Sequence, residues 1–133
     1  MAAIGTLVLP DGNTPPNNVT FYPIRPQQGN TPALWKTRES VALASQEITQ
    51  RVLQSSSRTN VTSKISIPIL EIVPEGCCTA DIPKVAFTDI CNIDIGFPLK
   101  SELADRQDMI SFIRAYVNSS VFENAALHFE QVW

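Results

Sequence analysis

The segment Thr88–Phe97, TDICNIDIGF, constrains the fold most strongly because its polarity alternates from one residue to the next. Side chains of a strand point alternately to opposite faces, so Ile93 and Ile95 share one face and Asn92 lies on the other. Pro98 then favours the end of the strand, because proline cannot donate a hydrogen bond to a neighbouring strand. The segment therefore predicts a strand whose apolar face must be covered by another part of the structure.

The chain before this strand is also predicted to be largely extended. Short β-branched and aromatic runs at residues 6–9 and 19–22, separated by turn-forming residues, predict an N-terminal hairpin with a long loop. An irregular connection then runs to Trp35. Residues 61–67 alternate in polarity, and a second apolar run at residues 69–73 follows the interruption at Pro68. These runs predict further strands of the same sheet.

Residues 37–54 fit two structures. The near-helical spacing of Val41, Ile48 and Val52 favours a helix, and so does the pairing of Glu47 with Arg51 four residues later. As a strand, the same segment places Ile48 and Val52 on one face and Thr49 and Arg51 on the other. Local propensity favours the helix.

The C-terminal third is predicted to form two helices. Ser101 is the expected N-cap of the first, and the apolar stripe of this helix is Leu103, Ile110, Ile113 and Val117. Residues 118–120 break the pattern and cap a second helix over residues 121–131. Strands followed by helices predict an α+β protein with segregated layers.

Length and composition restrict the class of protein. The 133 residues fit one domain, residues 1–133, and a hydrophobic content of 44% excludes a disordered chain. No apolar run approaches the roughly 20 residues that cross a membrane, and the N-terminus lacks the features of a signal peptide, so we expect synthesis in the cytoplasm and no membrane partner. The net charge of −3 argues against a surface that binds nucleic acid everywhere, although a local basic patch is compatible with it.

Few residues suggest chemistry. His128 is the only histidine, the carboxylates show no acid–base spacing, and no glycine-rich phosphate loop is present. Cys77, Cys78 and Cys91 fit neither a disulfide framework nor a zinc site. Cys91 lies on the apolar side of its strand and is expected to be buried. We therefore expect no enzymatic activity, no metal, no cofactor and no small-molecule substrate.

The order of these motifs resembles the coat proteins of the small single-stranded RNA bacteriophages, the leviviruses. Residues 81–98, with a proline near each end, look like the last strand of that family. Residues 48–56 with 64–68 look like its central RNA-facing hairpin, and residues 101–133 are similar to its two C-terminal helices. The resemblance runs from about Leu7 to the end of the chain. It favours the strand over the helix for residues 48–54.

The resemblance implies a fold and an assembly. The expected fold is an N-terminal β-hairpin, a five-stranded antiparallel sheet, and two helices that pack on the sheet of the partner subunit. Two chains would pair edge to edge into a dimer, and the dimers would build the icosahedral shell of a virion around a single-stranded RNA genome, in a bacterial host. In several members of the family, the dimer also binds an RNA hairpin and represses translation of the replicase.

The resemblance also implies site residues. The positions that match RNA-facing positions of the family are Thr49, Arg51, Thr62, Lys64, Ile90 and Asn92. Three positions depart from well-studied relatives: Ile90 stands in place of a tyrosine that stacks on a base, Leu53 in place of a basic residue, and Glu47 where some relatives have lysine. Cys77 and Cys78 are candidates for disulfides between subunits, because their loop is expected to meet its copies around the symmetry axes of the shell. The alternative is that both are reduced, exposed thiols.

Two other functions remain open at this point. One is a cellular, dimeric RNA-binding regulator that uses the same sheet face without forming a shell. The other is an enzyme, for which His128 and scattered carboxylates are the only support. Electron microscopy of the expressed protein separates the shell from the regulator.

Overall fold

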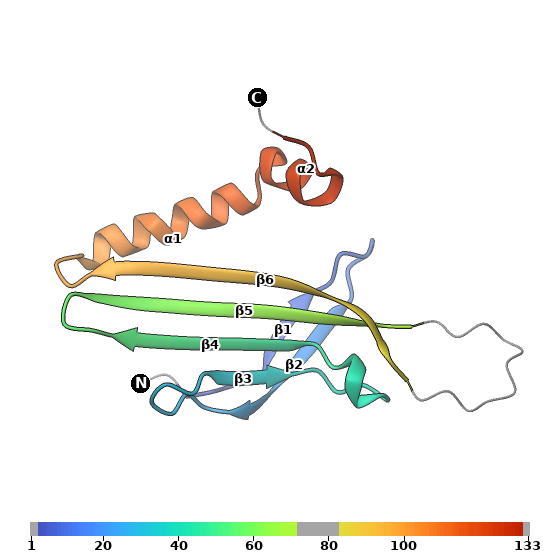
Figure 1. The fold of residues 1–133 in the computed structure, drawn as a ribbon. Coiled ribbons are helices and arrows are strands. Elements are labelled where there is room, and N and C mark those ends of the chain that lie inside the picture. Colours follow the sequence, from blue (N-terminus) through green and yellow to red (C-terminus); the bar gives the residue numbers. More distant parts are fainter. Residues whose placement is uncertain (1–2, 72–82, 132–133) are drawn as a thin grey trace, which may run out of the picture. The chain divides into compact units, whose positions relative to one another are not determined.

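The computed structural model of the protein describes residues 3–71 and 83–131. Within these residues, six strands form one antiparallel sheet in the order β1-β2-β3-β4-β5-β6, and two α-helices follow (Figure 1). The strands are β1 (Leu7–Pro10), β2 (Asn18–Arg25), β3 (Ala33–Lys36), β4 (Glu47–Gln54), β5 (Arg58–Leu70) and β6 (Val85–Pro98). The helices are α1 (Leu103–Val117) and α2 (Ser120–His128). The predicted α+β fold is confirmed, but the sheet has one strand more than expected.

The described residues form two compact units. The sheet unit comprises residues 1–55 and 59–96, and the helical unit comprises residues 56–58 and 97–133. The two units are separated by the density of contacts within each, which does not show whether either folds alone. The prediction of a single domain over residues 1–133 therefore stays a prediction.

The additional strand arises because the two halves of β2 pair with two different strands. Its first half pairs with β1, from Leu7 opposite Phe21 to Pro10 opposite Asn18. Its second half pairs with β3, beginning with Tyr22 opposite Lys36. The hairpin that the sequence predicts is therefore continuous with the main sheet.

The ambiguous residues 37–54 contain a strand. A short 3-10 helix, Ala42–Ala44, is followed by β4, which pairs with β3 on one side and with β5 on the other. The Thr37 N–H also donates to the Gln46 carbonyl at 3.0 Å, which extends the pairing beyond β3. Backbone hydrogen bonds to two neighbouring strands outweigh the small difference in local propensity that favours a helix.

Strand β5 runs through Pro68, where the sequence predicts an interruption. Its pairing with β4 ends at Ser66 opposite Glu47, so Pro68 lies beyond the part of β5 that β4 covers. A proline is tolerated in a strand where its missing donor is not needed by a neighbour.

The core of the sheet unit is small. Among the described residues, the buried apolar side chains are Phe21, Ala33 and Trp35, and Ile48 packs against them from β4. The Trp35 Nε1–H donates to the Gly5 carbonyl at 2.8 Å, which ties the N-terminal segment to β3. The core therefore lies in the half of the sheet built from β1 to β4.

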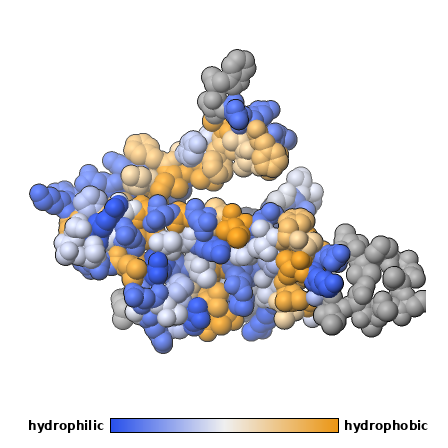
Figure 2. Space-filling view, in the orientation of Figure 1, coloured by the Kyte–Doolittle hydropathy of each residue, from blue (hydrophilic) through white to orange (hydrophobic). Residues whose placement is uncertain are grey.

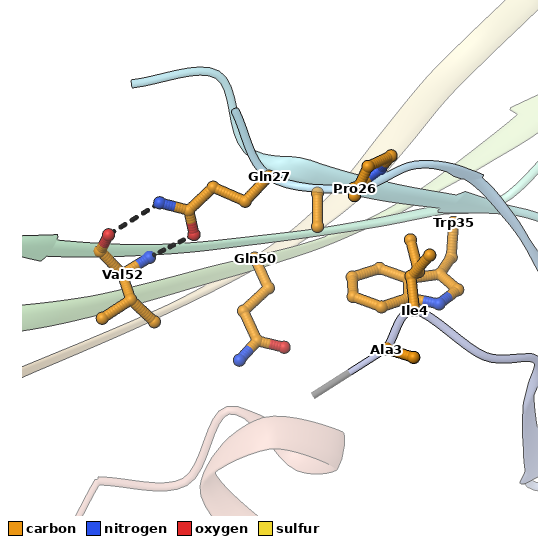
Figure 3. A pocket seen from close by; sticks show the side chains of 8 residues that line it. Ala3, Ile4, Pro26, Gln27, Trp35, Gln50 and Val52 are labelled. Atoms are coloured by element: carbon orange, nitrogen blue, oxygen red, sulfur yellow. Dashed lines mark hydrogen bonds between the residues drawn. The ribbon is translucent and has the colours of Figure 1, made fainter. Parts of the chain in front are cut away.

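A glutamine side chain completes the sheet where β3 ends. Strand β4 is longer than β3, and its Val52 lies beyond the last paired residue, Gln50. The Gln27 Nε2 donates to the Val52 carbonyl at 2.7 Å, and the Val52 N–H donates to Gln27 Oε1 at 2.8 Å (Figure 3). The amide thus provides the two hydrogen bonds that a neighbouring strand would make.

Helix α1 begins one residue later than predicted. The N-cap of α1 is Glu102 and not Ser101, because the Glu102 N–H donates to Asp105 Oδ2 at 3.1 Å within a capping box. The predicted cap of α2 is confirmed, since the Ser119 hydroxyl accepts a hydrogen bond from the Phe122 N–H at 3.3 Å. Neither helix contains a buried residue. Neither is long and apolar enough to span a lipid bilayer.

Candidate nucleic-acid interface

One face of the sheet unit carries polar and charged side chains from three neighbouring strands. The register places Lys36 opposite Glu47, Thr49 opposite Lys64, and Arg51 opposite Thr62. Residues directly opposite each other in an antiparallel pair project to the same side of the sheet. We call this surface the basic face, and its residues are Lys36, Glu47, Thr49, Arg51, Thr62 and Lys64.

The single acidic member of the basic face is paired. Lys36 Nζ lies 2.6 Å from Glu47 Oε1, and both side chains are partly exposed. Within the described part of the chain, no carboxylate lies within ion-pair distance of Arg51 or Lys64. Glu47 therefore cancels Lys36, and two cations stay available beside threonine hydroxyls. Such groups donate hydrogen bonds to phosphate oxygens.

The structure brings together four of the six residues predicted to contact RNA. Thr49, Arg51, Thr62 and Lys64 form two adjacent cross-strand pairs on β4 and β5. The other two, Ile90 and Asn92, are exposed and lie on β6, the strand next to β5. Because they are two residues apart, they share one face of β6. Contact of all six with RNA stays a prediction.

Sequence reasoning missed the contribution of β2 and β3 to this surface. Tyr22 lies opposite Lys36, and the Arg38 guanidinium carbon lies 3.9 Å from the centroid of the Tyr22 ring. The alternation of buried Ala33, Trp35 and Thr37 with Lys36 and Arg38 was the available signal. It was obscured because residues 37–54 also show helical spacing.

The opposite side of the same strands is apolar, and we call it the apolar face. It carries Phe21, Ala33, Trp35, Ile48 and Ile65. Two open grooves of about 230 and 380 Å³ lie on it.

The smaller groove is lined by residues that include Trp35, Gln50 and Val52 (Figure 3). The larger groove is lined by residues that include Val19, Ile65 and Ile67. Apolar side chains also reach the surface elsewhere on both units (Figure 2).

The cysteine predictions have different outcomes. Cys91 was expected to be buried, and this was wrong: its side chain is exposed, because β6 forms the edge of the sheet. Cys77 and Cys78 lie outside the described residues. In the regions that the structure describes, no group of three or more His, Cys, Asp or Glu side chains is arranged to hold a metal ion.

Comparison with known proteins places the chain in a family. The model of the levivirus coat protein family matches residues 2–133. A chain from the virus-like particle of bacteriophage NT-214 is 30% identical, with a TM-score of 0.94 over 99% of this chain and 100% of that chain.

Two more distant structures share the fold. The capsid protein of bacteriophage GA is 19% identical, with a TM-score of 0.69 over 91% of this chain and 92% of that one. An unassembled coat protein dimer, described as an RNA-binding dimer of a bacteriophage, is 18% identical, with a TM-score of 0.69 over 96% of both chains. No curated protein sequence gave a significant match. The family match over nearly the whole chain shows that this protein belongs to the levivirus coat protein family.

Proposed function

We propose that this protein dimerises, assembles into the icosahedral shell of an RNA phage, and packages single-stranded genomic RNA against the basic face. It would then be a structural component of the virion, synthesised in the cytoplasm of a bacterial host, and not an enzyme. The observation that carries the RNA part is the gathering of cations on one sheet face of a chain whose net charge is −3. Family membership and the likeness to a chain of the NT-214 virus-like particle support the shell.

The exposed surface of the chain supports dimerisation through β6. This strand has 14 residues, most of them exposed, and it ends the sheet. Phe87 and Ile90 on β6 are 58% and 55% exposed. An edge strand of this length presents unpaired backbone groups to another strand, and a second copy of β6 would satisfy them.

The apolar surfaces support the same conclusion. The grooves of the apolar face are open, and Phe112 on α1 and Leu127 on α2 are each 70% exposed. Apolar surface of this extent on both units is typical of a chain that completes its core with a partner. The helices of one subunit would therefore cover the apolar face of the other.

Electron microscopy and RNA measurement of the expressed protein test the proposal. We expect particles that contain host RNA. The double variant Arg51→Ala with Lys64→Ala should form particles with less RNA, and its RNA binding should depend less on salt concentration, because fewer counterions are released from phosphates. A matched control is Arg106→Ala with Arg114→Ala, which removes the same charge from α1.

The outcomes separate the alternatives. Equal RNA content in the two double variants would contradict a role for the basic face. Dimers that bind RNA without forming particles would instead indicate the regulatory RNA-binding protein. Repression of translation through a hairpin is the further activity proposed for this face. It requires that a dimer bind a replicase-start hairpin more tightly than an unstructured RNA of equal length.

A further inference from the structure

The contact between Arg38 and Tyr22 extends the basic face beyond the residues assigned above. Tyr22 lies opposite Lys36, so its ring is on the basic face. The other aromatic residues of β2 to β5, Phe21 and Trp35, are buried on the apolar face. Tyr22 is therefore the aromatic side chain that these four strands offer to a ligand on the basic face.

The pair places an exposed arginine over an aromatic ring. The guanidinium carbon lies 3.9 Å from the centroid of the half-buried Tyr22 ring, while Arg38 is exposed. A planar guanidinium that stacks on a ring with one side can stack on a second planar group with the other. Because the ring is held in the β2–β3 pairing, less conformational freedom of the arginine is lost when a ligand binds.

The local charge favours an anionic ligand with planar groups. The neighbouring Lys36 is neutralised by Glu47, whereas Arg38 has no carboxylate within ion-pair distance among the residues that the structure describes. Its N–H groups are available to a phosphate, and its plane is available to a base. Single-stranded RNA supplies both groups in one ligand.

We propose that Tyr22 and Arg38 form a stacking site for a nucleobase of single-stranded RNA, in a base–arginine–tyrosine stack. The inference rests on the proposed packaging of RNA against the basic face. Strands β2 and β4 are separated by β3, which places Tyr22 about 10 Å across the sheet from strand β4. The RNA would thus contact β2 and β3 as well as the predicted positions on β4 and β5, and the aliphatic Ile90 would not be the base-stacking residue.

A charge-conserving substitution isolates the stacking contribution. Arg38→Lys keeps the positive charge but removes the planar group. We expect purified full-length protein with Arg38→Lys to bind a short single-stranded oligoadenylate about tenfold more weakly than wild type, as measured by fluorescence anisotropy. Binding of the same oligonucleotide with abasic sites should be unchanged, because it offers phosphates without bases.

Three further variants sharpen the comparison. Tyr22→Leu should reproduce the base-dependent loss, whereas Tyr22→Phe keeps the ring and should behave as wild type. Arg114→Lys makes the same substitution on α1, outside the basic face, and should leave the binding of both oligonucleotides unchanged.

The outcomes distinguish failure of the proposed stacking site from failure of the proposed RNA packaging. Normal affinity of Arg38→Lys for oligoadenylate, or an equal loss with the abasic oligonucleotide, would overturn the stacking site alone. Failure of wild-type protein to bind either oligonucleotide, together with particles that lack RNA, would overturn the packaging proposal. Particle formation by each variant establishes that it folds.

Discussion

The two ends of the sheet differ in how much of their surface the chain covers by itself. At the end built from β1 to β4, Phe21, Ala33 and Trp35 are buried, and Gln27 supplies the hydrogen bonds that β3 is too short to make. At the other end, β6 carries apolar residues of the same kinds, but Phe87, Ile90 and Ile93 are exposed. The first end thus buries a small core within one chain, and the second end does not.

This difference indicates where the chain depends on a partner. Apolar side chains stay exposed at the β6 end of a single chain, so a second copy that covered them would add stabilisation in proportion to the area buried. Substitutions near Trp35 should therefore act on the chain itself. Changes to the surfaces that a second copy would cover should act on assembly.

Removal of residues 101–133 should have the most severe effect. It deletes both helices, which we propose to cover the apolar face of the partner, so the exposed face should cause aggregation. Size-exclusion chromatography and light scattering measure this. The matched control removes only residues from Phe129 onward, keeps both helices, and should stay soluble. A soluble, folded monomer without residues 101–133 would contradict the proposed exchange of helices.

Trp35→Ala should cause the next largest effect. Trp35 is 8% exposed and donates a hydrogen bond to Gly5, so its removal leaves a cavity and frees the N-terminal segment. We expect the free energy of unfolding to fall by about 3–5 kcal/mol in urea denaturation at fixed protein concentration. Val8→Ala, at a position 54% exposed on β1, is the control and should change it by less than about 0.5 kcal/mol. Equal losses in both variants would show that the core is not where the structure places it.

Gln27→Ala tests the hydrogen bonds that complete β4. Two bonds to the backbone of Val52 are lost, and we expect the free energy of unfolding to fall by about 1–2 kcal/mol. Hydrogen exchange of the Val52 amide should also become faster. The neighbouring Gln28→Ala is the control, because the two side-chain hydrogen bonds to Val52 come from Gln27 and not from Gln28. A Val52 amide that exchanges equally slowly in both variants would rule out this role.

Asp11 should give a small dependence of stability on pH. The Asn17 N–H donates to the Asp11 carboxylate at 2.8 Å, and the Asn13 N–H donates at 3.1 Å. These bonds lower the pKa of Asp11, chiefly through Asn17. A lowered pKa in the folded state means that the stabilisation is present above the ordinary pKa of an aspartate and is lost as pH falls through the folded-state value.

Comparison with Asp11→Asn isolates this effect. The variant lacks the titrating carboxylate, so its urea midpoint should fall less than that of wild type as the pH is lowered from neutral to acidic values. Parallel loss of stability in the two proteins would show that the Asp11 hydrogen bonds do not contribute to folding.

Local patterns were sufficient for the parts of the chain whose structure is set by their own residues. The alternation in Thr88–Phe97 predicted β6, and the alternation in residues 61–67 predicted the centre of β5. Both alternating patterns predicted the strand correctly, because a strand with one apolar and one polar face has a single favourable register with its neighbours. A cap within residues 118–120 was likewise predicted, and it is Ser119, because capping involves residues within one turn.

Tertiary structure decided the rest, where the deciding partner is distant in the sequence. Residues 47–54 have helical spacing, but strands on both sides hold them extended, and β2 adds a strand to the sheet by pairing its two halves with different partners. The basic face likewise needs the register of β2 to β5, which brings Tyr22, Lys36, Arg51 and Lys64 to one side. The sequence by itself determined which residues of a segment alternate between the two faces of a strand. Only the pairing between strands determined which residues of different strands share one face of the sheet, because cross-strand hydrogen bonds fix neighbours that chain order does not specify.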